Sequence, residues 1–237
     1  MQAPADFGPI YAETDLSRFP VEPFNTFSNL IFLLIVVVFA LRTKLDWKQH
    51  ALLVGCLPFV LIGFVGGSVF HATRSNSIWL VMDFLPILVL GLVGATYFWF
   101  RVIKHPFFAA TVMLTLLATP RALLWSMGAP RSIAISWGYA GMAVTILLPA
   151  LIDCARRGWV NFRYLLGAVL FFGLAVFFRS IDLGWGRELL PMGTHFLWHL
   201  CGGCAVYLLF EYLYSMRAKL LLHRHRPLPP QERIARR

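Results

Sequence analysis

The sequence predicts an all-α integral membrane protein, a bundle of seven transmembrane helices. Of its 237 residues, 59% are hydrophobic and 14% are charged, and the mean hydropathy is +0.70. A water-soluble domain of this length does not need so apolar a composition for its core. Seven crossings of ~20 residues each would use most of the chain and leave no room for a second domain. Because lipid cannot satisfy open backbone groups, the crossings are expected to be closed helices.

Seven apolar segments, separated by charged residues, proline or glycine, account for these crossings. In chain order they cover residues 24–42, 51–72, 77–99, 107–125, 133–153, 163–182 and 193–214. Each is near the ~20 residues that a helix needs to cross the hydrocarbon core. The fourth is interrupted by Pro120 and Arg121, so a re-entrant segment is the alternative there.

The distribution of charge predicts the orientation. The net charge of +10 does not indicate a nucleic-acid partner, because the basic residues lie between the apolar segments and in the final tail. Lys and Arg collect on the cytoplasmic side of short loops. With the N-terminus outside, 15 of the 21 Lys and Arg residues are cytoplasmic and 6 are outside. Seven of those 15 belong to the tail, so the loops alone favour this orientation by 8 to 6. The C-terminus is then cytoplasmic.

Three regions follow from this reading: an N-terminal acidic segment (1–22), a seven-transmembrane domain (23–215) and a basic cytoplasmic tail (216–237). The first 19 residues lack the basic start and apolar core of a signal peptide, so the first apolar segment is expected to stay in the protein. The four cysteines lie in or beside apolar segments and indicate no disulfide framework.

Five polar residues within the apolar segments are candidates for chemistry, because polar side chains in a bilayer are costly and usually functional. They are Ser68, His71, Asp83, His195 and His199. At 1.5 Å per residue, each lies within roughly 10 Å of the same membrane surface, on the side of the N-terminus. A structural alternative exists for each histidine alone, as an interhelical hydrogen-bonding residue.

His195 and His199 are four residues apart and share one helix face, the spacing of paired helical zinc ligands. His71 from another helix completes a catalytic set of three imidazoles, which leaves one tetrahedral position for water. Asp83 is predicted to be the base that takes the proton of that water. Cys201 and Cys204 follow closely, but helical angles place them on the other side of this helix, where small residues favour close packing.

Four blocks of sequence carry a resemblance to a known family. They are Glu22-Pro-Phe-Asn25-Thr-Phe-Ser-Asn29, Gly67-Ser68-Val-Phe-His71-Ala-Thr73, Asp83-Phe-Leu-Pro86-Ile and His195-Phe-Leu-Trp198-His199-Leu200. In these blocks the sequence resembles the alkaline ceramidases, which belong to a seven-transmembrane zinc hydrolase superfamily that also includes the adiponectin/progestin-type receptors. The resemblance covers Tyr11 to about Tyr214.

The resemblance implies that His71, His195 and His199 bind zinc and that Asp83 handles the proton. It also implies a serine that stabilises the oxyanion, for which Ser68 is the candidate. The family's serine precedes its histidine by four residues, whereas Ser68 precedes His71 by three and Gly67 holds the four-residue position.

Some members of the family also bind calcium through an acidic N-terminal segment near the zinc site. Glu13, Asp15 and Glu22 are the corresponding candidates, and oxygen ligands suit calcium. Ile10 stands where the family's first acidic residue is expected, and the stretch between Glu13 and Glu22 is shorter. An acidic surface loop is the alternative. The segment is also expected to pack over the zinc site, with Glu22 capping the first helix or binding calcium.

The predicted function is a zinc-dependent intramembrane amide hydrolase that cleaves ceramide-like lipids, taken from the bilayer, to a fatty acid and a sphingoid base. A hydrolase of another acyl lipid is the nearest alternative, because three histidines do not select the bond. A non-catalytic or weakly hydrolytic receptor of the same superfamily is the rival from another class. Such receptors are expected to have N-terminal extensions and an inside N-terminus, and this chain shows neither feature.

Overall fold

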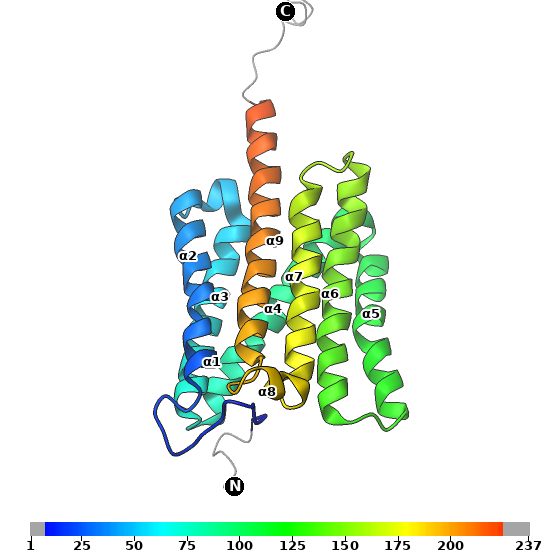
Figure 1. Ribbon diagram of the computed structural model, residues 1–237. Coiled ribbons are helices and arrows are strands. Elements are labelled where there is room, and N and C mark those ends of the chain that lie inside the picture. The colour runs from blue at the N-terminus through cyan, green and yellow to red at the C-terminus, as the bar shows by residue number, and fades with distance from the viewer. Residues whose placement is uncertain (1–7, 225–237) are drawn as a thin grey trace, which may run out of the picture.

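A computed structural model describes residues 8–224, apart from the side chains of residues 131, 132, 134–136 and 218–224. Over this range the chain is helical without strands, and the predicted all-α bundle is confirmed (Figure 1). The helices are α1 (Pro23–Ser28), α2 (Leu30–Thr43), α3 (Trp47–Thr73), α4 (Ser77–Val102), α5 (Pro106–Ser126), α6 (Arg131–Arg156), α7 (Phe162–Ile181), α8 (Trp185–Leu189) and α9 (His195–Arg224).

Seven helical spans in the described chain are long and apolar enough to cross a membrane, and they coincide with the seven predicted segments. The first span combines α1 and α2, and the short α8 is not a span. The fourth, α5, continues through Pro120 as one helix of 21 residues. The proline therefore does not break this helix.

Local sequence accounts for several helix ends. Pro23 and Pro106 begin α1 and α5, in the first turn, where the missing N–H costs no hydrogen bond. The side chain of Asp46 accepts a hydrogen bond from the amide of Gln49 at the start of α3. Asn76 caps α4 in the same way, through the amide of Ile78.

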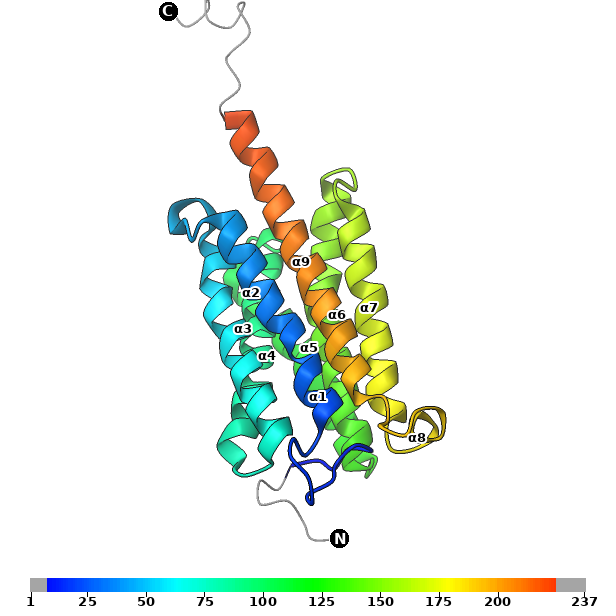
Figure 2. The same ribbon diagram turned by 60° about the vertical axis from the view of Figure 1, so that its left-hand side comes forward.

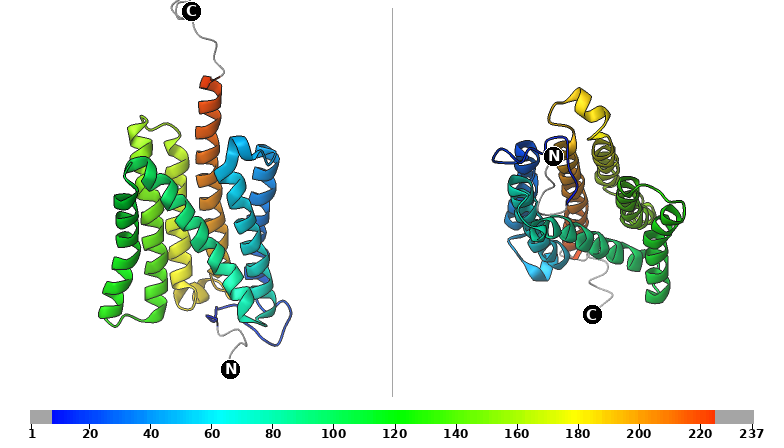
Figure 3. Two further views of the ribbon diagram at one scale, coloured as in Figure 1. Left: turned by 180° about the vertical axis from the view of Figure 1, so that it is seen from behind. Right: turned by 90° about the horizontal axis from the view of Figure 1, so that it is seen from below.

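Helix α9 lies between the two sides of the bundle and contacts helices on both. It packs along α7 on one side and against α1, α2 and α3 on the other, as Figures 1 and 2 show. Seen from below in Figure 3, the N-terminal segment lies across the end of the bundle at which α9 begins. The loops α3–α4 and α5–α6 are at this same end, which we call the near end; the opposite end is the far end.

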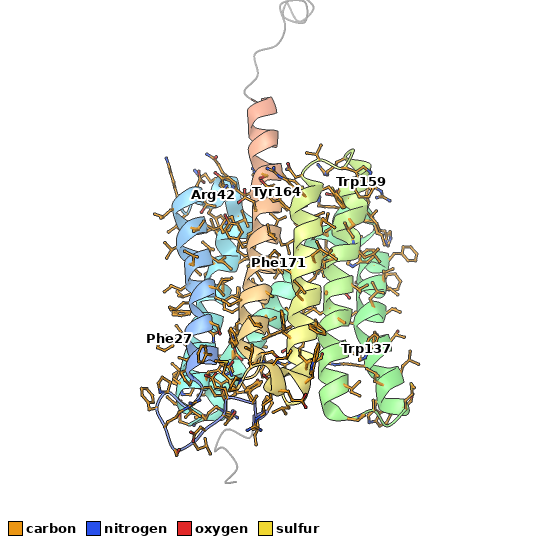
Figure 4. All side chains as sticks on the ribbon, viewed as in Figure 1. Phe27, Arg42, Trp137, Trp159, Tyr164 and Phe171 are labelled. Carbon is orange, nitrogen blue, oxygen red and sulfur yellow. The ribbon has the colours of Figure 1, made fainter. Side chains whose placement is uncertain are left out.

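The buried apolar clusters lie toward the far half of the bundle. One joins Ile35 and Phe39 of α2 to α3 and to Phe210 of α9, and a second joins Phe98 of α4 to Tyr212 of α9. Exposed tryptophans lie toward both ends, such as Trp137 and Trp159 in Figure 4, as is typical of side chains at the two membrane interfaces. The near half therefore has room for polar groups between its helices.

Candidate metal centre

Three histidines meet at the near end. His71 lies in the last turn of α3, and His195 and His199 lie in the first two turns of α9. One ring nitrogen from each lies within 4.8 Å of the other two, and the residues are only 0%, 2% and 4% exposed. Within the described part of the chain, this is the group of His, Cys, Asp and Glu side chains that could hold a metal ion. The predicted convergence of the three histidines is confirmed.

Two of the rings are fixed from outside the group. His71 Nδ1 is 2.5 Å from Glu22 Oε2, and His199 Nδ1 is 3.2 Å from the carbonyl oxygen of Asn25 and 2.7 Å from Ser28 Oγ. An imidazole that donates from Nδ1 to an oxygen keeps its lone pair on Nε2. Carboxylates and carbonyls hold metal-binding histidines in this way.

Two ring nitrogens of the group are unsatisfied. Among the described residues, His71 Nε2 and His195 Nδ1 are buried without a hydrogen-bond partner. A buried polar atom left in this state costs about 1–3 kcal/mol. A metal ion between the three rings would satisfy such nitrogens, so the donor set fits a bound metal.

The N-terminal segment packs over these histidines, as predicted. The amide of Val21 donates to the carbonyl of Ala72 at 2.9 Å, and the amide of Glu22 donates to that of His71 at 3.0 Å. The Tyr11 ring is stacked on His195, with 3.8 Å between ring centroids and an interplanar angle of 22°. Burial raises the pKa of the Tyr11 hydroxyl. The segment therefore shields the histidine group from the aqueous side.

Glu22 connects the segment to the histidines. It is fully buried and receives hydrogen bonds from Thr14 Oγ1 (2.5 Å), Arg74 (2.6 Å), His71 Nδ1 (2.5 Å) and the side chain of Asn25 (3.1 Å). Burial acts to raise the pKa of Glu22, but the hydrogen bonds from His71 and Thr14 and the charge of Arg74 hold it below its usual range. Glu22 thus stays ionised while inaccessible to water.

The other two acidic residues of the segment have separate roles. Glu13 accepts hydrogen bonds from the amides of Phe24 (2.6 Å) and Asn25 (2.9 Å), so Glu13 caps α1, whereas Glu22 makes no side-chain cap there. Burial raises the pKa of Glu13, against the effect of those two amides. Asp15 is exposed, and hydrogen bonds from Ser17 lower its pKa. The expectation that Glu22 caps the first helix is therefore wrong, since Glu13 does so.

The suggested calcium ligands are not gathered into a site. Among the described residues, Glu13, Asp15 and Glu22 do not form a group able to hold a metal ion. Glu22 already accepts from four donors, and Glu13 is engaged by the backbone of α1. In this arrangement the positive charge beside Glu22 comes from Arg74, which is 2% exposed.

Asp182 fixes the start of α9. Its carboxylate accepts hydrogen bonds from the amides of Thr194 (2.7 Å), His195 (2.9 Å) and Ala12 (3.0 Å). Gly193 has a φ of +73°, and any side chain there would collide with Ala12 and Asp182. The carboxylate thereby sets the position of His195 and of the N-terminal segment together.

Asp83 lies near the histidine group without joining it, and among the described residues Ser68 makes no hydrogen bond with the three rings. Asp83, in α4, interacts electrostatically with His71 and lies outside the set of three ligands. A Cβ atom at Gly67 would be 2.5 Å from Asp83 Oδ1 and 2.7 Å from Asn29 Oδ1, so no side chain fits at the position of the family's serine. Ser68 Oγ is buried, without a hydrogen-bond partner among the described residues.

Cys201 and Cys204 are free thiols outside the histidine group. Between them, Gly203 is buried against α2, and a Cβ there would lie 2.6 Å from Ile31. The small residue allows the two helices to approach closely, as the sequence predicts.

Several site residues had no role assigned from the sequence. Asn25, Ser28 and Asn29 share one face by their spacing of three and four residues, a signal that could have marked them. Tyr11 and Arg74 act through contacts with distant parts of the chain, and no local pattern marks them. Asp182 is expected in a structural role beside the site from its spacing of three residues after Arg179, and its carboxylate accepts backbone amides at the start of α9.

A scan against models of protein families and a search of curated proteins found no match to this chain.

Proposed function

We propose that this protein is a zinc-dependent intramembrane amide hydrolase, related to the alkaline ceramidases, which cleaves a ceramide-like lipid to a fatty acid and a sphingoid base. The observation that carries the proposal is the buried group of His71, His195 and His199, with inner ring nitrogens that lack partners and Asp83 nearby. Three imidazoles suit zinc. Bound there, zinc would lower the pKa of water to about 7 and polarise a carbonyl group.

Residues of this chain would orient the histidines and transfer the proton. Glu22 holds His71 as the tautomer whose lone pair faces inward, and the Asn25 carbonyl does so for His199. Asp83 accepts the proton lost by water as its oxygen bonds to the carbonyl carbon. When the carbon–nitrogen bond breaks, Asp83 returns the proton to the leaving amine. The fatty acid and the sphingoid base are the products.

The position of the site supports a lipid substrate. The histidines lie at one end of the helical spans. We infer that this end meets the bilayer near the amide of a lipid, below the headgroup. Long acyl chains can then remain in the bilayer while the amide reaches the site. We place the N-terminus outside, so the site belongs to the outer face of the membrane.

The test is turnover of labelled lipids by the purified, zinc-loaded protein. The panel contains ceramide, a second lipid amide and a lipid ester. We expect release of labelled fatty acid from ceramide, which a chelator stops and added zinc restores, while Asp83→Asn with full zinc is the inactive control. Turnover of the ester alone would reassign the substrate. No turnover of any lipid by zinc-loaded protein would overturn the proposal and favour a receptor.

A further inference from the structure

A second polar cluster adjoins the histidine group, and Arg179 is at its centre. The guanidinium carbon of Arg179, in the last turn of α7, lies 5.1 Å from the ring centroid of Tyr139 and 5.3 Å from that of Trp198. These two rings, from α6 and α9, are 4.9 Å apart. Trp198 directly precedes His199. We call Arg179, Tyr139, Trp198 and Tyr11 the arginine cluster.

The positive charge of Arg179 acts on the proposed catalytic group. Arg179 interacts electrostatically with Asp83, His195 and His199. It also interacts with the hydroxyl of Tyr11, whose ring covers His195. A lipid held with its amide at the histidines would therefore have neighbouring atoms beside the guanidinium.

Arg179 differs from Arg74, Glu13 and Asp182, the charged groups that hold the N-terminal segment and the helix starts at the near end. Arg74 is paired with Glu22, and Glu13 and Asp182 accept backbone N–H groups. Among the described residues, no carboxylate forms an ion pair with Arg179; Asp182, three residues away, is occupied by the start of α9. A cation in a membrane span that lacks such a partner marks a functional position.

The Tyr11 hydroxyl takes one hydrogen bond from Arg179, and the aromatic contacts leave its other N–H donors for a ligand. Rings that pack on a guanidinium stabilise its charge without taking the N–H groups, which point outward in its plane. These N–H groups form a fork that matches the two oxygens of a carboxylate. The cluster thus holds a fixed positive charge with directional donors next to the proposed reaction site.

We propose that Arg179 binds an oxygen anion carried by the acyl lipid next to the scissile bond. This proposal rests on the proposed function for the lipid nature of the ligand. Two sources share the chemistry: the carboxylate of the released fatty acid, and an acidic headgroup on the uncleaved substrate. In the first case Arg179 retains the product, and in the second it selects the substrate.

The test measures lipid binding to the full-length, metal-free protein in detergent, so that neither zinc nor turnover contributes. The probes are oleate, oleamide and N-oleoylglycine, at a pH where both acids are ionised. We expect one or both acids to bind about tenfold or more tightly than oleamide. Arg179→Gln should abolish that preference, and Arg179→Lys, which lacks the fork, should reduce it. Arg187→Gln, on exposed α8, is the matched control and should keep it.

Each outcome has one meaning. Tighter binding of oleate alone assigns Arg179 to the product, tighter binding of N-oleoylglycine alone assigns it to an acidic headgroup, and tighter binding of both assigns it to both anions. Equal affinity for the three probes, or a preference that survives Arg179→Gln, overturns the proposal. If the Gln variant does not fold, the Lys variant decides, because an unchanged preference there contradicts recognition by the guanidinium. A failure of the proposed function would appear in turnover and not in this binding assay.

Discussion

The two ends of the bundle stabilise their buried charges in different ways. At the far end, carboxylates pair with arginines: Glu211 of α9 with Arg42 of α2, and Asp153 of α6 with both Arg101 (3.3 Å) and Arg157 (3.0 Å). These arginine side chains are 24–39% exposed, so they can reach water or lipid headgroups. The carboxylates of Glu211 and Asp153 are thus satisfied by arginines of this chain.

At the near end, the carboxylates are used to position other groups. Glu13 and Asp182 hold the starts of α1 and α9, and Glu22 holds His71. Among the described residues at this end, His71 Nε2 and His195 Nδ1 have no hydrogen-bond partner, and no carboxylate forms an ion pair with Arg179. The far end also has buried polar atoms without partners, on His50, Asn161 and Tyr212, but these belong to separate helices or loops and form no metal group among the described residues. The difference indicates that the near end is built to receive ligands.

The largest effect is expected from removing two metal ligands. His195→Ala with His199→Ala should reduce bound zinc from about one per chain to almost none, because two of three protein ligands are lost. Elemental analysis of the purified protein measures this. Cys201→Ser with Cys204→Ser, and Asp153→Asn at the far end, should keep the zinc. Full zinc occupancy in the double alanine variant would mean that the two ends do not differ in this way.

Asp83→Asn is expected to have the next largest effect. It should lower turnover of the lipid amide by roughly 100-fold or more, the scale of general acid–base catalysis, and leave zinc content unchanged. Turnover and zinc are measured on the same preparation. Unchanged turnover would show that another group accepts the proton, and lost zinc would make Asp83 a ligand.

Glu22→Gln tests whether the near-end carboxylate acts on the metal through His71. Zinc affinity should fall by about 10–100-fold, the usual cost of losing such a partner of a metal ligand. Competition with a chromogenic chelator gives the affinity. The far-end variant Glu211→Gln, which loses the same charge, should leave zinc affinity as it is. An equal effect of the two variants would point to general destabilisation.

A pair of arginine variants compares the stability that each end gains from its ion pairs. Arg74→Gln leaves Glu22 buried beside an uncharged group, which should cost about 3–5 kcal/mol and lower Tm by roughly 10 °C. Arg157→Gln should cost about 0–1 kcal/mol, because its side chain is 39% exposed and Arg101 still pairs with Asp153. Thermal unfolding followed by fluorescence measures both. Similar Tm values for the two variants would remove the contrast.

The spans and the group of three histidines could be predicted because their signals are local. A run of ~20 apolar residues is its own evidence for a span, and His195 and His199 share a helix face through their spacing alone. Depth along the helices then places His71 and Asp83 at the same end. The alternative of a re-entrant segment at Pro120 was wrong, because α5 continues through this proline. A proline within a membrane helix is tolerated when its surroundings satisfy the freed backbone groups.

The contacts of the N-terminal segment could not be predicted in this way. Glu22 meets His71 and Arg74 across 49 and 52 residues, and Ala12 meets Asp182 across 170. From the sequence, Glu13, Asp15 and Glu22 are expected near the first span, but no local pattern shows which hydrogen-bond or ion-pair partner each carboxylate has. Glu13 caps α1 by accepting a hydrogen bond from the amide of Phe24, eleven residues later. This contact depends on how the N-terminal segment folds back onto the helix.

The smallest effect is expected from adding calcium. This experiment tests whether the acidic N-terminal segment is a calcium site or a surface loop that binds no ion. If Arg74 and the other donors already satisfy Glu22, adding millimolar calcium or a calcium chelator should shift Tm by no more than about 1 °C, and Asp15→Ala should be neutral because Asp15 is exposed. If calcium binds the segment, its addition should raise Tm and turnover together, since a ligand stabilises the state that it binds.

Glu22→Ala is a poor test of calcium binding, because this change also removes the hydrogen-bond partner of His71. Glu13→Gln is better, since it removes one charge and can still accept from an α1 amide. A calcium response that Glu13→Gln abolishes would restore the calcium site, while zinc binding at the three histidines would be unaffected.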